Sequence, residues 1–235
     1  MNNTEADRIE KIATNSLYSI GVMEKSISYC FKVFKRSMVE GSVLELGPAE
    51  GVMTEYLQTF TTDLTVVEGS QVFCDSLKKK FPNIDVVNCL FEDFQPDKQY
   101  DNIVLGHVLE HVIDPADLLR RVKKWLAPDG RLLTAVPNAL SIHRQAAVRM
   151  GLLKTEAALN SLDIHHGHRR VFTPDEFRDI FGQAGLEIKL FGGYWFKPLS
   201  HSQIEATWND KMIDAFMALG EKYPEIAGEI YVIAK

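Results

Sequence analysis

The order of apolar segments along the chain predicts an α/β fold built on a mostly parallel sheet. Two observations carry this prediction: short apolar runs recur along the sequence, and segments with the period of a helix lie between them. Because parallel strands are joined by crossovers that are usually helices, this alternation is typical of βαβ units. The expected strands cover residues 43–46, 64–67, 84–88, 102–105, 131–136, 186–191 and 229–234.

Local signals place the helices between these strands. Pro115 suits the first position of a helix, where its missing N–H costs nothing. Thr173 and Glu176 have the spacing of a capping box, and Gly185 is typical of a helix end. Pro128-Asp129-Gly130 predicts a turn over 127–130. The expected helices cover residues 52–60, 72–81, 115–126, 174–184 and 210–222.

Two segments depart from this rhythm. Residues 1–40 are expected to form an N-terminal helical arm, because apolar residues in 17–38 recur at helical steps. Residues 41–235 then form one domain. Within it, residues 138–171 lack a regular pattern and carry four of the seven histidines. A loop of this length is usually functional, so we expect an insertion after the fifth strand that folds over the site as a lid.

Composition narrows the class of protein. The chain has 235 residues, 26 basic and 32 acidic side chains and a net charge of −6, with 46% hydrophobic and 25% charged residues. These values exclude disordered and fibrous proteins, and the acidic balance argues against nucleic-acid binding. Three distant cysteines and no apolar run long enough to span a bilayer predict a cytoplasmic protein without a membrane segment.

The turn after the first expected strand favours one class of ligand. Glu45 lies in the strand, and Gly47, Ala49 and Gly51 follow it. A dinucleotide-binding turn requires G-x-G-x-x-G, and Ala49 and Val52 occupy the second and third of these positions. The Glu45 carboxylate would repel a phosphate but attract the ammonium and sulfonium groups of S-adenosylmethionine, so the sign of the charge favours this methyl donor.

A second acid supports an adenosine-containing ligand. Glu68 ends the second expected strand, next to Gly69, 23 residues after Glu45. A carboxylate at this strand end can accept hydrogen bonds from both ribose hydroxyls. This feature alone does not separate the methyl donor from a dinucleotide, since both contain adenosine.

Four ordered motifs resemble those of the class I S-adenosylmethionine-dependent methyltransferases. Residues 45–51 resemble the E-x-G-x-G-x-G motif with alanine for the middle glycine, and residues 108–115 resemble VLEHV-x-DP. Glu68 and the L-x-P-G-G-x-L-like segment at 126–132 complete the set. The resemblance implies a doubly wound, seven-stranded, Rossmann-like sheet and the product S-adenosylhomocysteine. It also implies donor contacts from Phe91, Glu92, Gly106 and His107, with Leu90 where the family often has an aspartate.

A narrower resemblance concerns the acceptor. Residues 167–173 are similar to the GH-x-x-x-FT segment of a bacterial branch that modifies secondary metabolites, quinones or sugars. The resemblance implies a small-molecule acceptor, with oxygen favoured, and a histidine as general base. The order of preference for the base is His168, then His166, then His107. An acidic or phosphorylated acceptor would fit the residues expected to bind it, which are Tyr18, His143, His165, Arg169, Arg170, Tyr194 and Lys197.

Several alternatives stay open at this point. The acceptor atom could be nitrogen, the substrate could be a protein, or the chain could be a binding module without activity; it could also be a monomer or a homodimer. No metal is expected, because Gly106 and His107 follow the fourth strand where catechol-type enzymes have acids. The group Asp163, His165, His166 and His168 is not expected to bind a metal, since adjacent histidines project apart.

Overall fold

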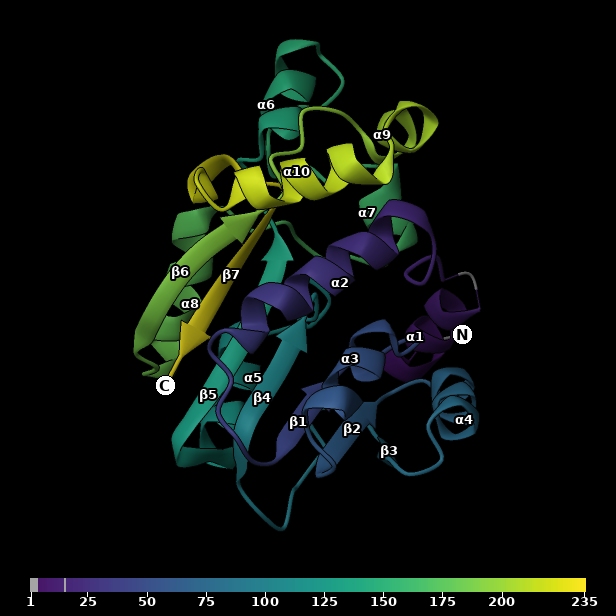
Figure 1. Cartoon of the computed structure of the whole chain (residues 1–235), viewed down its shortest axis with the longest axis vertical. Coiled ribbons are helices and arrows are strands. Elements are labelled where there is room, and N and C mark those ends of the chain that lie inside the picture. Colours follow the sequence, from purple (N-terminus) through teal and green to yellow (C-terminus); the bar gives the residue numbers. More distant parts are fainter. Residues whose placement is uncertain (1–3, 15) are drawn as a thin grey trace.

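The computed structural model describes residues 4–14 and 16–235. Seven strands of this part of the chain form one sheet in the order β3-β2-β1-β4-β5-β7-β6 (Figure 1). β1 to β5 are parallel, whereas β7 runs antiparallel between β5 and β6. The predicted doubly wound, mostly parallel seven-stranded sheet is confirmed. The strands are β1 Val43–Leu46, β2 Leu64–Glu68, β3 Asp85–Asn88, β4 Tyr100–Gly106, β5 Leu126–Pro137, β6 Ile188–Tyr194 and β7 Glu229–Ala234.

Helices cover both faces of the sheet. One apolar core cluster joins the sheet to α5 and α8, and a second joins it to α2, α3 and α10. Figure 1 shows α2 crossing one face of the sheet and α5 and α8 behind it. The helices are α1 Glu5–Ala13, α2 Gly21–Lys35, α3 Val52–Phe60, α4 Gln71–Lys80, α5 Pro115–Trp125, α6 Ile142–Arg149, α7 Ser161–His165, α8 Pro174–Ala184, α9 His201–Thr207 and α10 Asp210–Gly220, with a short 3₁₀ turn at Pro224–Ile226.

The central strands divide their side chains between these two clusters. Leu44 and Leu46 of β1 belong to the cluster with α5 and α8, while Val43 belongs to the other. All three are at most 1% exposed. Successive strand side chains point to opposite faces, so a parallel strand covered on both sides is apolar throughout. This explains why the sequence shows these strands as short apolar runs.

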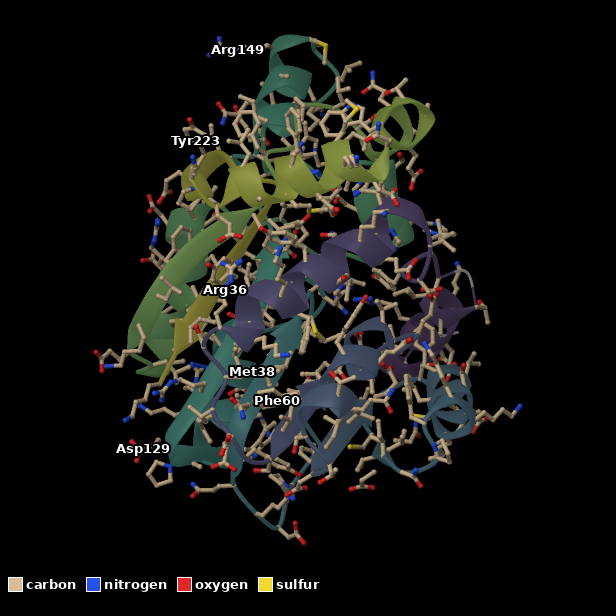
Figure 2. All side chains as sticks on the ribbon, in the orientation of Figure 1. Arg36, Met38, Phe60, Asp129, Arg149 and Tyr223 are labelled. Carbon is tan, nitrogen blue, oxygen red and sulfur yellow. The ribbon has the colours of Figure 1, made fainter. Side chains whose placement is uncertain are left out.

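The carboxyl ends of the parallel strands are covered by segments from the second half of the chain. Figure 1 shows α6, α7, α9 and α10 gathered beyond the ends of β4 and β5. Figure 2 places Arg149 at the outer end of α6 and Asp129 at the opposite end of the molecule. The insertion 138–171 therefore lies at the edge where open α/β sheets bind ligands. Its movement as a lid stays a prediction.

Several boundaries differ from those expected from sequence. The described part of the arm contains two helices: α1 ends at Ala13, and α2 begins at Gly21, which has a left-handed φ of +60°. The predicted turn at 127–130 lies inside β5, where the register between Tyr100 and Asn102 is interrupted. α9 was not expected, although Ser200 and Gln203 form a capping box at its start. No helix in residues 4–14 and 16–235 is long and apolar enough to cross a membrane.

Candidate active site

A cavity of about 620 Å³ lies at the carboxyl ends of β1, β2 and β4. Its size falls within the range of small-molecule sites, about 300–1,000 Å³. The arm, the β1–α3 turn, the segment after β4, the insertion and the segment before α9 all contribute to its wall. The predicted donor residues that line it are Glu45, Gly47, Ala49, Glu68, Gly69, Phe91, Glu92, Gly106 and His107.

The β1–α3 turn approaches the cavity through left-handed backbone. Gly47, Ala49 and Gly51 have φ angles of +67°, +48° and +78°. A Cβ on Gly51 would lie 2.7 Å from Leu77 Cδ2, so glycine is required there by packing as well as by conformation. Gly51 shapes the turn without lining the cavity. Ala49 is the strained member, because alanine rarely adopts a positive φ.

Glu45 is a buried acid at the base of this turn. Its side chain is almost fully buried, and Thr54 Oγ1 donates a hydrogen bond of 2.6 Å to Glu45 Oε2. Burial raises the pKa of Glu45 to about 8, and the nearby Glu68 adds to this effect. A cationic ligand would favour the ionised form of Glu45. The position therefore suits a positively charged donor, as the sequence indicated.

Glu68 joins two loops at the end of β2. Its carboxylate accepts hydrogen bonds from the backbone N–H groups of Ala49, at 3.1 Å, and Ser70, at 2.9 Å. Burial raises the pKa of Glu68, while these N–H groups act against the shift. Glu10 of α1 contacts the same loop, because its carboxylate accepts a hydrogen bond of 2.9 Å from Ser70 Oγ. The arm is thus attached to the predicted ribose-binding corner.

His107 follows β4 and forms a buried pair with Glu229 of β7. His107 Nε2 lies 3.2 Å from Glu229 Oε2 and 3.4 Å from the Tyr194 hydroxyl. Burial lowers the pKa of His107, but the hydrogen bond and charge of Glu229 outweigh it, and the net pKa is raised. His107 also has a φ of +61°, an uncommon conformation that is typical of functional sites. The pair has the form of an oriented general base.

The insertion contributes three of its four histidines to the cavity: His143, His166 and His168. His166 stacks on Tyr18 of the arm with ring centroids 4.6 Å apart. Burial lowers the pKa of His166 to about 4, which makes it a weak base at neutral pH. His168 Nδ1 lies 3.4 Å from Asp163 Oδ1. Tyr18 and His143, which were predicted to bind the acceptor, also line the cavity.

Lys197 brings a buried cation to the same cavity. It is 4% exposed, and its Nζ lies 3.1 Å from His201 Nδ1 and 4.7 Å from the centroid of the Trp195 ring. Burial lowers the pKa of Lys197 to about 8. Among the described residues, no carboxylate lies within ion-pair distance of this ammonium group. Lys197 was predicted to bind the acceptor, and it lines the cavity.

Four residues predicted to bind the acceptor do not line the cavity in the described part of the chain: His165, Arg169, Arg170 and Tyr194. Arg169 donates to the His111 carbonyl and pairs with Glu5, and Arg170 donates to the Val112 carbonyl. Both arginines therefore attach the insertion to the segment after β4. His165 is exposed, and the fully buried Tyr194 lies behind His107.

Sequence reasoning missed Glu229, Glu110 and His201. Glu110 stands inside the VLEHV-like string and could have been selected from it. Glu229 could not have been selected from sequence. It reaches this edge of the sheet because β7 pairs with β5, which places Glu229 opposite Pro137.

Comparison with known proteins fits this geometry. A family model described as a methyltransferase domain matches residues 18–189. The chain belongs to the methyltransferase domain family. The resemblance found in the sequence motifs is thereby confirmed, and the chain is an S-adenosylmethionine-dependent methyltransferase.

Individual relatives of this methyltransferase are distant. A ubiquinone biosynthesis O-methyltransferase of Dinoroseobacter shibae is 34% identical over 104 residues, which cover 44% of this chain and 40% of the relative. The enzyme of the same name from Rickettsia typhi is 21% identical over 98% of this chain and 97% of its own length.

Solved structures share the fold at lower identity. The CcbJ methyltransferase of Streptomyces caelestis has a TM-score of 0.66 and 14% identity, covering 100% of this chain and 99% of its own. The N-methyltransferase NodS of Bradyrhizobium japonicum was solved in complex with S-adenosyl-L-homocysteine. It has a TM-score of 0.57 and 14% identity, and the match covers 91% of this chain and 86% of NodS. This likeness shows the Rossmann-like methyltransferase fold.

Proposed function

We propose that this methyltransferase transfers the methyl group to an oxygen atom of a small-molecule acceptor in a biosynthetic pathway. The observation that carries this proposal is the His107–Glu229 pair, which lies in the same cavity as the predicted donor residues. An amine acceptor can react as the neutral base, whereas a hydroxyl must lose its proton as the new bond forms. A buried, carboxylate-oriented imidazole is the group that a hydroxyl requires.

The reaction is an in-line displacement. The acceptor oxygen attacks the methyl carbon, the carbon–sulfur bond breaks, and its electron pair stays on sulfur in S-adenosylhomocysteine. His107 with its proton on Nε2 donates to Glu229, which leaves Nδ1 free to accept the hydroxyl proton. Because the sulfonium already activates the methyl group, the protein contributes alignment and proton removal.

The donor half of the cavity is assigned from residue chemistry. Glu68 is proposed to accept the ribose hydroxyls, and Glu45 to favour the cationic end of the donor. Phe91 and Glu92 line the cavity where the adenine is expected. This arrangement uses the β1, β2 and β4 ends, which meet at the strand-order reversal of the sheet.

The acceptor half carries positive charge from Lys197. Because no described carboxylate pairs with its ammonium group, an anionic group on the acceptor would supply the missing partner.

The relatives named ubiquinone biosynthesis O-methyltransferases support an oxygen acceptor. The structural neighbour NodS is an N-methyltransferase, so a small-molecule amine is the second candidate. The three free cysteines support a cytoplasmic location.

His107→Asn tests this function. With an isotopically labelled donor and a panel of hydroxyl and amine acceptors, we expect O-methylated products from the parent enzyme. In His107→Asn, kcat measured at saturating donor should fall roughly 10²- to 10⁴-fold. Glu229→Gln should lower kcat less and shift the pH profile, because Glu229 acts through the imidazole. Only N-methylated products, or a kcat within about threefold of the parent, would contradict the proposal.

A further inference from the structure

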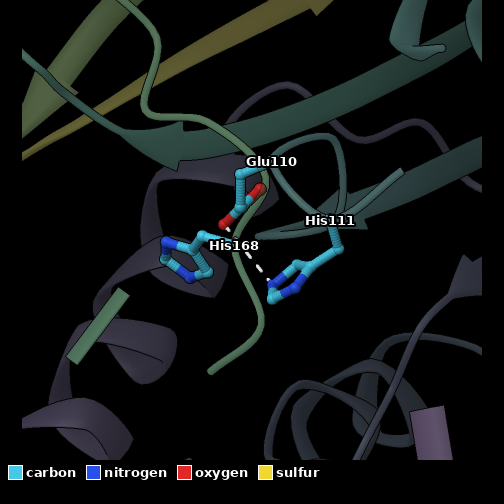
Figure 3. Close-up of side chains that lie close together, drawn as sticks. All are labelled: Glu110, His111 and His168. Carbon is cyan, nitrogen blue, oxygen red and sulfur yellow. Dashed lines mark ion pairs between the residues drawn. The ribbon is translucent and has the colours of Figure 1, made fainter. Parts of the chain in front are cut away.

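Three side chains converge on one point of the cavity wall. Glu110 and His111 belong to the segment after β4, and His168 comes from the end of the insertion (Figure 3). Their candidate ligand atoms all lie within 4.8 Å of one another, and His111 Nε2 is 4.0 Å from Glu110 Oε1. All three residues line the cavity that holds the predicted donor site.

Glu110 is the unexplained member of this group. Its side chain is 0% exposed, and neither carboxylate oxygen has a hydrogen-bond partner among the described residues. A buried polar group without a partner is costly, and native proteins contain few of them. A fully buried carboxyl group aimed at two imidazoles therefore indicates a missing positive partner.

The Asp163 carboxylate lies behind His168, on the side away from Glu110. Asp163 Oδ1 lies 3.4 Å from His168 Nδ1, which leaves Nε2 for another partner. Asp163 is itself fixed by the buried Arg144, 3.1 Å away, and by the backbone N–H of Asn160. Carboxylates commonly orient metal-binding histidines through the second ring nitrogen in this way.

Hydrogen bonds to its backbone carbonyl fix the position of His111. Its carbonyl accepts hydrogen bonds from Arg8 of the arm, at 3.0 Å, and Arg169 of the insertion, at 2.8 Å. The arm and the insertion therefore fix the segment that carries Glu110 and His111. These contacts give Arg169 a structural role that does not involve the acceptor directly.

We propose that Glu110, His111 and His168 bind a divalent first-row transition-metal ion. Two ligands about 2.1 Å from such an ion lie roughly 3.0–4.2 Å apart, so the widest separation in the group, up to 4.8 Å, needs to shorten by roughly 0.6–1.8 Å when the ion binds. Two imidazoles and one carboxylate favour zinc, manganese, iron or cobalt over magnesium, which prefers oxygen ligands. Three protein ligands leave coordination positions open to the cavity.

The open positions give the ion a role that rests on the proposed function. A metal-bound acceptor hydroxyl is a stronger acid, so the ion would fix the acceptor oxygen and assist its loss of a proton to His107. This inference departs from the expected absence of a metal. Asp163, which the sequence grouped with His165, His166 and His168, lies behind His168, and Glu110 and His111 lie in front of it.

Metal binding by the donor-free full chain tests the inference separately from methyl transfer. After removal of metal with a chelator and desalting, cobalt(II) and zinc(II) are titrated by visible absorption and calorimetry. The parent chain should bind one equivalent, and Glu110→Gln and His168→Ala should lower the affinity roughly 100-fold or more. Asp163→Asn should lower it about 10- to 100-fold, as expected for a residue that orients a ligand.

His165→Ala is the matched control, because this histidine is exposed and does not line the cavity. It should retain the parent affinity. Circular dichroism of each variant verifies folding, and Glu110→Gln should fold because it removes no hydrogen bond of the described structure. Absence of stoichiometric binding by the parent, or equal affinity in folded Glu110→Gln, overturns the proposal, as does a loss of binding in His165→Ala.

Discussion

At the scale of single residues, the β1–α3 turn stores strain where the family-like motif departs from glycine. Ala49 has a φ of +48° and its N–H is bonded to Glu68. The left-handed conformation costs an L-residue roughly 1–2 kcal/mol. The sequence identified the departure at Ala49, but only the backbone shows that the position has the conformation of glycine.

Ala49→Gly should therefore stabilise the protein. The gain in unfolding free energy is expected to be up to about 1 kcal/mol, since glycine relieves the strain but loses more entropy on folding. Urea denaturation measures it. Ala146→Gly, at an exposed position of α6, is the control and should lose about 0.5–1 kcal/mol. Equal losses in the two variants would show that Ala49 is unstrained.

Glu45 makes stability depend on pH. Its folded pKa is raised to about 8, above the usual value of a carboxyl group, so the folded state holds its proton more tightly than the unfolded state. Unfolding free energy should thus fall as pH rises from about 5 to 8, by at most about 1.4 kcal/mol per unit. Urea unfolding at several pH values should show this slope in the parent and a flatter profile in Glu45→Gln. Parallel profiles would mean that Glu45 titrates normally.

At the scale of elements, the arm and the insertion are attached to each other over the cavity. Arg8 of α1 donates to the Gly167 carbonyl, and Tyr18 stacks on His166. Gly167 has a φ of +77°, and a Cβ there would lie 2.3 Å from Ile12 Cδ1. The insertion can thus meet α1 only through a glycine.

Gly167→Ala should lower stability by more than its conformation alone explains. Gly151→Ala is a matched control, because Gly151 has a φ of +72° with nothing within 4 Å of an added Cβ. We expect Gly151→Ala to cost about 1 kcal/mol and Gly167→Ala about 1–3 kcal/mol more. Adding Ile12→Ala to Gly167→Ala should reduce the extra cost in urea denaturation. Similar losses of unfolding free energy in the two glycine variants would mean that Ile12 of α1 does not clash with a side chain at residue 167.

Most elements could be predicted from sequence because their signals are local. The strand β7 and the helix α8 occur where apolar runs and the Thr173 capping box indicated them. The division of the arm at Gly21 could not be predicted, since the helical period continues on both sides. α9 was predictable from its capping box but lies in a segment with little apolar pattern.

At the scale of the whole molecule, sheet topology decides which residues form the site. Glu45, Glu68 and His107 could be selected from sequence because each lies at or next to the carboxyl end of a parallel strand, and such ends meet at one edge. Glu229 enters the same site at the start of an antiparallel strand, which the order of segments does not reveal. Glu110, His111 and His168 come together only because the insertion returns to the end of β4.

The central claim is that this topology builds a site for S-adenosylmethionine, and calorimetric titration of the donor tests it most directly. The parent should bind the donor and its product, and Glu68→Gln should weaken binding roughly 10- to 100-fold through the loss of charge-assisted hydrogen bonds. Glu55→Gln, which alters only an exposed carboxylate paired with Lys80, should leave the affinity unchanged. An unchanged affinity in Glu68→Gln, or tighter binding of a nicotinamide dinucleotide than of the methyl donor, would contradict the account.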